Sequence, residues 1–116
     1  MITTHILDTA AGRPARGVPV ELERLAESVF GGSMDWEPVG AGVTDDDGRQ
    51  RELTQVGPVD PGVYRIRFKT GEYFTANKIA GFFPVVEIQF TVDDGAQHYH
   101  VPLLLSPYGY STYRGS

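Results

Sequence analysis

Apolar residues recur at every second position along several stretches of this chain. The pattern is clearest in residues 18–22, 64–68 and 86–92, and residues 2–7 and 36–43 are plausible members of the same class. A period of two is the period of a β-strand with one face toward a core. The sequence therefore predicts strands in these stretches. The positions expected to point inward are Val18, Val20, Leu22, Tyr64, Ile66, Phe68, Val86, Ile88, Phe90 and Val92.

Turn-forming residues separate these predicted strands. The chain has 14 Gly and 8 Pro, and together with Asp and Ser they gather at residues 8–14, 31–33, 45–48, 57–62 and 93–95. Short strands at such intervals indicate an all-β sandwich or barrel. Because 116 residues suit one core, we expect a single domain over residues 1–116.

Two segments depart from the strand pattern. The stretch near residues 71–79 lacks the alternation, and we expect one short helix there. Thr70 is expected to cap this helix, with Glu72 and Tyr73 in its first turn. Residues 25–35 are interpreted as a long loop between two strands.

Composition argues against several kinds of chemistry and partner. The chain has no cysteine, which excludes disulfides, thiolate zinc sites and a cysteine nucleophile. A net charge of -5 argues against a nucleic-acid partner. The first residues lack a basic region followed by an apolar one, and no stretch approaches the ~18 apolar residues of a membrane span. We therefore expect a cytoplasmic protein whose mature chain is the whole chain, without a membrane partner.

The last predicted strand, residues 98–105, becomes apolar on both faces. One face carries His98, His100, Pro102 and Leu104, and the other carries Tyr99, Val101, Leu103 and Leu105. A strand in a two-layer sandwich normally keeps one wet face, so a second apolar surface is often covered by another subunit. We therefore expect an oligomer. Cover by the chain's own tail is the alternative.

The chain has only three histidines, and they lie in the first and last predicted strands. His98 and His100 project on the same side of one strand, and a sandwich could bring His5 to them. Such a cluster could carry acid–base chemistry. An H-x-H pair with a remote histidine also fits a His₃ metal site, and exposed strand histidines are often only polar surface. The histidines alone leave these three interpretations open.

Tyrosines are concentrated at the end of the chain. Four of the six, Tyr99, Tyr108, Tyr110 and Tyr113, lie within residues 99–116. A chain end is usually polar and disordered unless it is tied down, so this composition predicts a tail that packs into a cleft and lines it. The alternative is a tail that only covers a sheet edge.

An arginine follows one of the predicted turns directly. Arg49 comes after the turn at residues 45–48, at the expected start of a strand, and Arg51 shares its face. Such an arginine is usually solvated, but its planar fork of donors suits carboxylates, imides or ring carbonyls. The sequence contains no serine-hydrolase, nucleotide-binding or zincin motif.

The segment HYHVPLLLSPYGYSTYRGS, at residues 98–116, resembles the C-terminal signature of the 5-hydroxyisourate hydrolases, the transthyretin-like enzymes of purine degradation. Further matches are THILDTAAGRPARGVPVEL at 4–22, TDDDGR at 44–49, FKTGEYF at 68–74 and FFP at 82–84. The most specific element is Tyr113-Arg114-Gly115-Ser116, because transthyretin itself lacks it. The resemblance covers essentially the whole chain.

The resemblance implies an all-β, transthyretin-like sandwich of two four-stranded sheets with one short helix. It also implies a homotetramer whose active sites lie in the channel between dimers, with no metal and no cofactor. The predicted loop at residues 25–35 is longer than in many relatives. We expect it at the surface, without effect on the chemistry.

The activity implied by the resemblance is hydrolysis of 5-hydroxyisourate to 2-oxo-4-hydroxy-4-carboxy-5-ureidoimidazoline in urate degradation. The family pattern places His5, Arg49, His100 and Tyr113 around the substrate. Adding water to a ring carbonyl requires a base for the water and positive charge for the oxyanion. We assign water activation to His100, with His5 as its partner or as proton donor to the leaving ring nitrogen, and the two could be exchanged. Arg49 would hold the ring carbonyls, and further substrate contacts are expected from Tyr113, Ser111 and His98.

Three alternatives remain at this stage. One is a carrier of the transthyretin type, which would hold a hydrophobic ligand and need neither the histidines nor Arg49. Another is a β-sandwich interaction module without chemistry. The third is a metal-dependent form of the same hydrolase.

Overall fold

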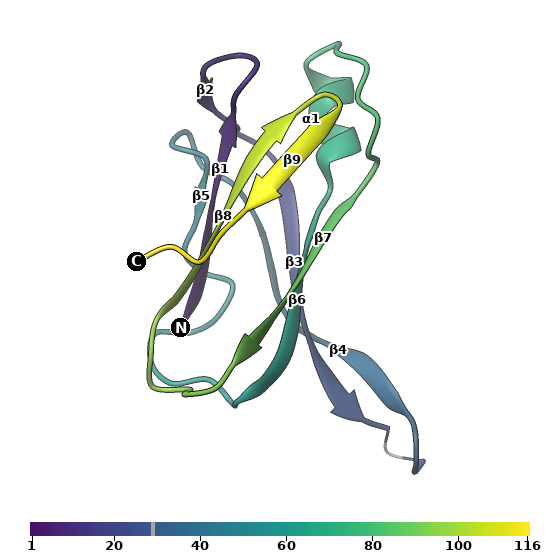
Figure 1. Cartoon of the computed structure of the whole chain (residues 1–116), viewed down its shortest axis with the longest axis vertical. Coiled ribbons are helices and arrows are strands. Elements are labelled where there is room, and N and C mark those ends of the chain that lie inside the picture. The colour runs from purple at the N-terminus through teal and green to yellow at the C-terminus, as the bar shows by residue number, and fades with distance from the viewer. Residues whose placement is uncertain (29) are drawn as a thin grey trace.

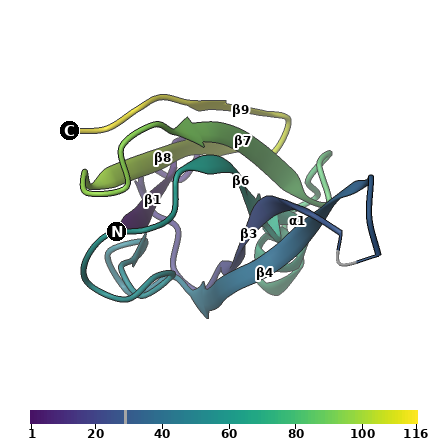
Figure 2. The same ribbon diagram turned by 90° about the horizontal axis from the view of Figure 1, so that it is seen from below.

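The computed structural model describes residues 1–28 and 30–116 and shows two β-sheets packed face to face (Figures 1 and 2). The first sheet has the order β2-β1-β8-β9, and a short strand, β5, also pairs with β1. The second sheet has the order β4-β3-β6-β7. The strands of the first sheet are β1 (Ile2–Asp8), β2 (Arg13–Pro14), β5 (Arg49–Gln50), β8 (Tyr99–Ser106) and β9 (Gly109–Thr112). Those of the second are β3 (Pro19–Glu27), β4 (Met34–Val43), β6 (Gly62–Phe68) and β7 (Val86–Val92). The predicted sandwich of two sheets is confirmed, with β5 as an additional two-residue strand.

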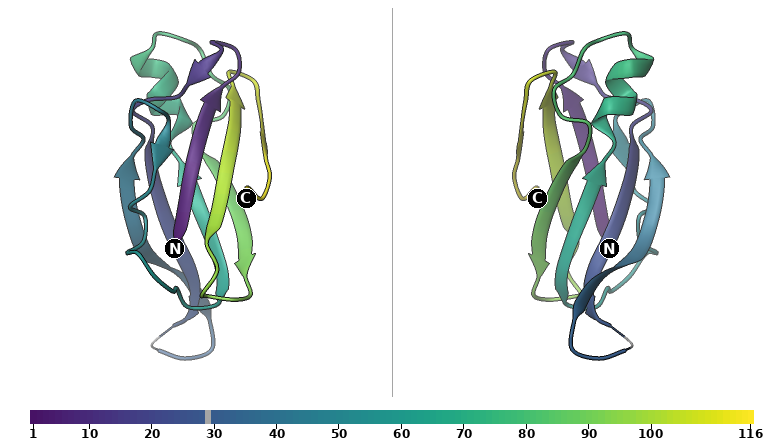
Figure 3. Two further views of the ribbon diagram at one scale, coloured as in Figure 1. Left: turned by 90° about the vertical axis from the view of Figure 1, so that its left-hand side faces the viewer. Right: turned by 90° about the vertical axis from the view of Figure 1, so that its right-hand side faces the viewer.

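The first sheet joins the two ends of the chain. Strands β1 and β8 run parallel, and Thr3 lies opposite His100. On its other side β1 pairs with β5, which sets His5 opposite Arg49. The left view of Figure 3 shows both termini on this sheet. Pairing between distant segments thus gathers residues that the sequence separates widely.

The core lies between the inward faces of the two sheets and follows the predicted alternation. Side chains that are 2% exposed or less include Ile6, Val20, Leu22, Ile66 and Phe68. In β7 only Val86 and Val92 are buried, whereas Ile88 and Phe90 are half-buried. Because β7 is the last strand of its sheet, its middle is covered on one side only.

The single helix of the described residues, α1, spans Thr70–Ala76 and is shorter than the stretch predicted near 71–79. Lys78 adopts a left-handed backbone with φ 58°, which stops the helix. The expectation that Thr70 caps this helix is wrong. Thr70 is the first helical residue, and its hydroxyl donates to the Phe83 carbonyl over 2.8 Å. Tyr73 attaches the helix to the sandwich by donating from its hydroxyl to the buried carboxylate of Asp8 over 2.7 Å. None of the described helices is long and apolar enough to cross a membrane.

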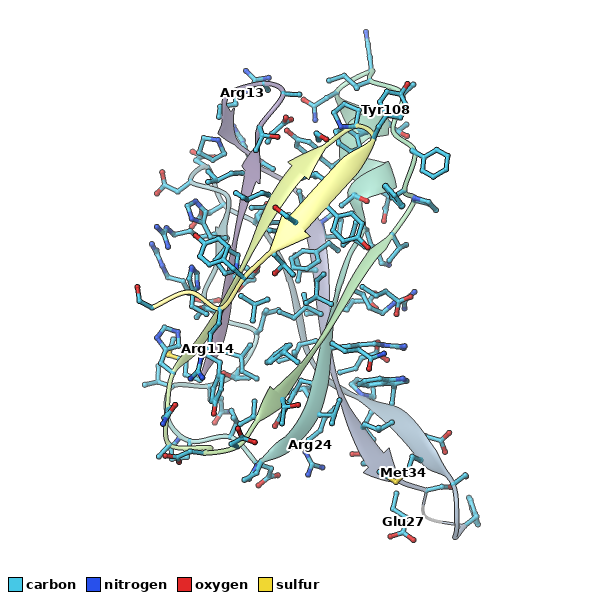
Figure 4. All side chains as sticks on the ribbon, viewed as in Figure 1. Arg13, Arg24, Glu27, Met34, Tyr108 and Arg114 are labelled. Carbon is cyan, nitrogen blue, oxygen red and sulfur yellow. The ribbon has the colours of Figure 1, made fainter. Side chains whose placement is uncertain are left out.

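The loop predicted at residues 25–35 is shorter than expected. Strand β3 continues to Glu27 and β4 begins at Met34, so both ends of the predicted loop belong to the strands of a long hairpin. The hairpin projects from the sandwich, at the corner that Glu27 and Met34 mark in Figure 4. The alternation is lost here because both strands extend past the core, and their side chains are mostly exposed. The part of the prediction that falls on residue 29 lies outside the described residues.

Candidate active site

Three strands bring His5, Arg49 and His100 to the outer face of the first sheet. In β1, Ile2, Thr4 and Ile6 are fully buried toward the core, so the alternating positions, His5 among them, point outward. The parallel register with β8 sets Thr3 beside His100 and His5 beside Pro102. The antiparallel pairing with β5 sets Arg49 on the other side of His5.

A hollow of about 170 Å³ opens on this face. It is lined by Met1, Thr3, Thr4, Arg49, Arg51, His98, His100 and Ser116. Among the described residues, Arg49 has no carboxylate within ion-pair distance, so its guanidinium is available to a ligand. A hollow with two arginines and two imidazoles suits a planar, polar ligand with carbonyl or carboxylate oxygens.

Hydrogen bonds hold each imidazole in place. The Thr3 hydroxyl lies 2.8 Å from Nε2 of His98 and 2.8 Å from Nδ1 of His100. The Nε2 atom of His5 lies 2.8 Å from the backbone carbonyl of Asp47. Because a carbonyl only accepts, His5 donates from Nε2 and presents Nδ1 elsewhere. His100 in turn presents Nε2, the nitrogen that Thr3 does not engage.

The surroundings favour the neutral form of His100. Partial burial lowers the pKa of this imidazole below its ordinary 6.5, and electrostatic interactions with Arg49, His5 and His98 lower it further. The neutral imidazole, with one N–H, is therefore the favoured form of His100 at neutral pH. A neutral imidazole next to a guanidinium can accept a proton while the guanidinium stabilises a developing oxyanion.

The tail runs antiparallel along β8 as an edge strand and reaches this site at its end. Strand β9 pairs Thr112 with Leu103, and after a short break Gly115 pairs with His100 in the same register. Tyr113 thus lies opposite Pro102, whose other neighbour is His5. The Tyr113 side chain is 57% exposed.

The rest of the tail does what both interpretations predicted. Arg114 lies over the ring of Tyr99 at 4.6 Å and donates to Gln97 over 2.9 Å (Figure 4), away from the hollow. The tail pairs with the edge of β8, and it also lines hollows: residues 112–114 line a second one of about 220 Å³ against β7, and Ser116 lines the first. Leu104, on the apolar face of β8 that was expected to be covered, is half-buried in the single chain.

The structure brings together most of the predicted site residues. His5, Arg49, His98 and His100 gather on one face. Across the strands of this sheet, Arg49, His5, Pro102 and Tyr113 lie side by side in one row, with Tyr113 at its end. Ser111 pairs with Leu104, nearer the far end of β8, and does not line the hollow.

Sequence reasoning missed Thr3, which bridges two of the histidines. A signal for it existed, because Thr3 lies two positions before His5 and so on the same face of the strand. Its proximity to His98 and His100, however, depends on the pairing of β1 with β8. Within the part of the chain that the structure describes, no three His, Asp or Glu side chains are arranged to hold a metal ion.

Fold and site together define a two-sheet β-sandwich with a histidine–arginine cluster suited to hydrolysis on one outer face. The model of the HIUase/Transthyretin family matches residues 2–115, and the chain belongs to this family. The resemblance inferred from the sequence is thereby confirmed.

The similar proteins include both 5-hydroxyisourate hydrolases and transthyretins. The chain is 46% identical over 116 residues to the 5-hydroxyisourate hydrolase of Salmonella dublin, covering 100% of this chain and 81% of the relative. The solved 5-hydroxyisourate hydrolase of Klebsiella pneumoniae superposes with a TM-score of 0.82 at 35% identity, covering 99% of this chain and 98% of the other. Sea bream transthyretin in complex with thyroxine superposes with a TM-score of 0.84 at 33% identity, covering 98% and 93%. The fold is thus common to a 5-hydroxyisourate hydrolase and to a transthyretin that binds thyroxine, and the site residues have to separate the two.

Proposed function

We propose that this chain hydrolyses 5-hydroxyisourate in urate degradation. The observation that carries the proposal is the neutral imidazole of His100 beside the unpaired guanidinium of Arg49 in one hollow. An apolar carrier site has no use for either group. The identity to the Salmonella hydrolase over the whole chain supports the same substrate.

In the proposed mechanism His100 acts as the general base. Its Nε2 takes a proton from water as the water attacks a ring carbonyl of the substrate, and Arg49 stabilises the negative charge that develops on the carbonyl oxygen. The carbon–nitrogen bond of the ring then breaks, and the leaving nitrogen takes the proton that Nε2 of His100 received from the water. His5, whose own Nε2 proton is held by the Asp47 carbonyl, is the partner that presents Nδ1 to the site. His100 is the better base of the two because its surroundings favour the neutral form. No covalent intermediate is involved.

Tyr113 is proposed to close the site over the substrate. In the single chain this side chain is 57% exposed although it lies in the row of Arg49, His5 and Pro102. A second copy of the chain packed on this face would cover Tyr113 and the half-buried Leu104. We therefore retain the homotetramer with sites between dimers as a proposal, for which gel filtration is the test. Elution at the volume of a monomer would contradict it.

The alternative function is transport of a small apolar ligand, favoured by the close match to a thyroxine-bound transthyretin. The hollow against β7, whose apolar lining is Ile88, Phe90 and Val101 and which also reaches His100 and Arg114, would be the place for such a ligand.

The decay of freshly prepared 5-hydroxyisourate, followed by its ultraviolet absorbance and by optical rotation of the product, separates the two functions. A hydrolase speeds the decay and yields one enantiomer in excess. Replacing His100 by alanine should lower turnover about a hundredfold or more, on the usual scale for a general base. Decay no faster than in buffer, from a folded protein, would favour the carrier.

A further inference from the structure

The hydroxyl of Thr3 is enclosed between two imidazoles. Its oxygen lies 2.8 Å from Nε2 of His98 and 2.8 Å from Nδ1 of His100, and the Thr3 residue is only 4% exposed. His100 is half-buried, whereas His98 is exposed just before β8 begins. The two histidines do not touch directly, since their ring centroids are 6.3 Å apart. Thr3 is therefore the link between them.

The arrangement couples the protons of the three side chains, because the tautomer of each histidine decides the direction of its hydrogen bond to Thr3. A threonine hydroxyl has one proton to donate and lone pairs that accept. When the hydroxyl donates to Nε2 of His98, its oxygen can only accept from His100, so His100 carries its proton on Nδ1. The Nε2 atom of His100 then bears the lone pair.

This tautomer is the one that a general base on this face requires. The nitrogen that carries the proton in a neutral histidine is set by the hydrogen bond that the other nitrogen makes. A base held in the wrong tautomer is severely impaired, as substitution of the orienting group in serine proteases shows. Desolvation around His100 makes a misplaced proton harder to exchange with solvent.

We propose that Thr3 and His98 form a positioning pair that fixes the ring and the tautomer of His100. This inference rests on the proposed function of the site, with His100 as the base. Thr3 acts by accepting the Nδ1 proton of His100. His98 acts one step further away, by taking the proton of the Thr3 hydroxyl and so leaving only lone pairs for His100. Neither residue needs to touch the substrate.

The direct test is the tautomer itself, read from ¹⁵N shifts of histidine-labelled protein at about pH 8, above the ordinary histidine pKa of ~6.5. The chain has only three histidines, so variants at His5 and His98 assign the signals. In the wild-type protein His100 should be protonated on Nδ1. In Thr3→Val, which keeps the shape of the side chain, a large fraction should move to the form protonated on Nε2.

Turnover of 5-hydroxyisourate supplies the second readout. Thr3→Val should lower kcat by about tenfold to a hundredfold, within the range lost when a general base is impaired, and leave KM within about twofold. Thr3→Ser restores the hydroxyl and should recover most of kcat. His98→Ala, at an exposed position, should lower kcat in the same direction by a smaller factor.

A matched control is Thr9→Val, because Thr9 also bonds β8, through the Leu105 carbonyl at 3.2 Å, but lies outside the hollow. It should leave both readouts unchanged.

The inference is overturned if wild-type His100 carries its proton on Nε2. It is equally overturned if Thr3→Val folds and keeps the wild-type tautomer and kcat. If Thr3→Val does not fold, the same result from His98→Ala overturns it. A wild-type protein that does not accelerate decay of the substrate refutes instead the proposed function, whatever the tautomer.

Discussion

A single methyl group added at Gly115 should disable the site without unfolding the protein. Gly115 lies against the face of His100, where its backbone N–H donates to the His100 carbonyl over 2.8 Å. A Cβ at this position would lie 2.6 Å from Cδ2 of the imidazole, 3.2 Å from Cγ and 3.3 Å from Cβ. Rotation of the ring moves Cδ2 but leaves the tight contacts at Cγ and Cβ, so relief of the overlap either turns the imidazole away from its position or displaces the tail.

The size of the effect follows from these distances. Non-bonded carbon atoms prefer separations of about 3.5–4.0 Å, so the imidazole or the tail must shift by about 0.9 Å. A shift of the imidazole breaks its 2.8 Å hydrogen bond to Thr3, and a shift of the tail displaces Tyr113. A misplacement of about 1 Å at a catalytic group can cost a hundredfold in rate, or about 2.7 kcal/mol in the barrier. Loss of the single backbone bond of Gly115 costs only about 1 kcal/mol of stability.

Steady-state hydrolysis of 5-hydroxyisourate by Gly115→Ala measures this directly. We expect kcat/KM to fall about a hundredfold while the melting temperature falls by no more than about 8 °C. Gly109→Ala is the matched control in the same tail, because its Cβ would meet only Ser106 Oγ at an ordinary 3.6 Å. A Gly115→Ala enzyme with wild-type kcat/KM would refute the placement of the tail against His100.

Further predictions concern pH, stability and the tail. Because the pKa of His100 lies below 6.5, the acid limb of kcat/KM should have its midpoint below pH 6.5, since protonation removes the base. Arg49→Met removes a positive charge that lowers this pKa, so a pH–rate profile should show the limb at higher pH and a maximum about 10²–10³ lower. Tyr73→Phe leaves the buried Asp8 carboxylate without a 2.7 Å partner and should destabilise the fold by about 1–3 kcal/mol in urea titration, with kcat/KM nearly unchanged. Burial of Tyr73 is the main cause, and its hydrogen bond to Asp8 the second, that raise the pKa of this tyrosine to about 12. Ultraviolet titration should therefore find its phenol neutral through pH 10. Removing residues 113–116 should abolish hydrolysis while the circular dichroism spectrum persists, and an active truncated enzyme would show that Tyr113 is dispensable.

The sequence by itself determined the longer strands and the side chains of the core, but not the short strands β2 and β9. Alternation of the kind seen from Tyr64 to Phe68 is a local property, because a strand of period two shows which positions face inward without any knowledge of its neighbours. The same reasoning failed in the long hairpin, where β3 and β4 extend past the core and no burial imposes a pattern. It also misplaced the cap of α1, since the Thr70 hydroxyl bonds Phe83, a residue outside the helix.

The residues of the site were accessible from the sequence, but their arrangement was not. His5, Arg49 and His100 could be named from motif resemblance, whereas the role of Thr3 depends on a pairing between residues 97 positions apart. That pairing arises because β1 and β8 run parallel in one sheet, a long-range choice that local spacing does not specify. The same choice places Gly115 on His100. Tertiary structure alone therefore decided which nitrogen of His100 is held and which is presented to the hollow.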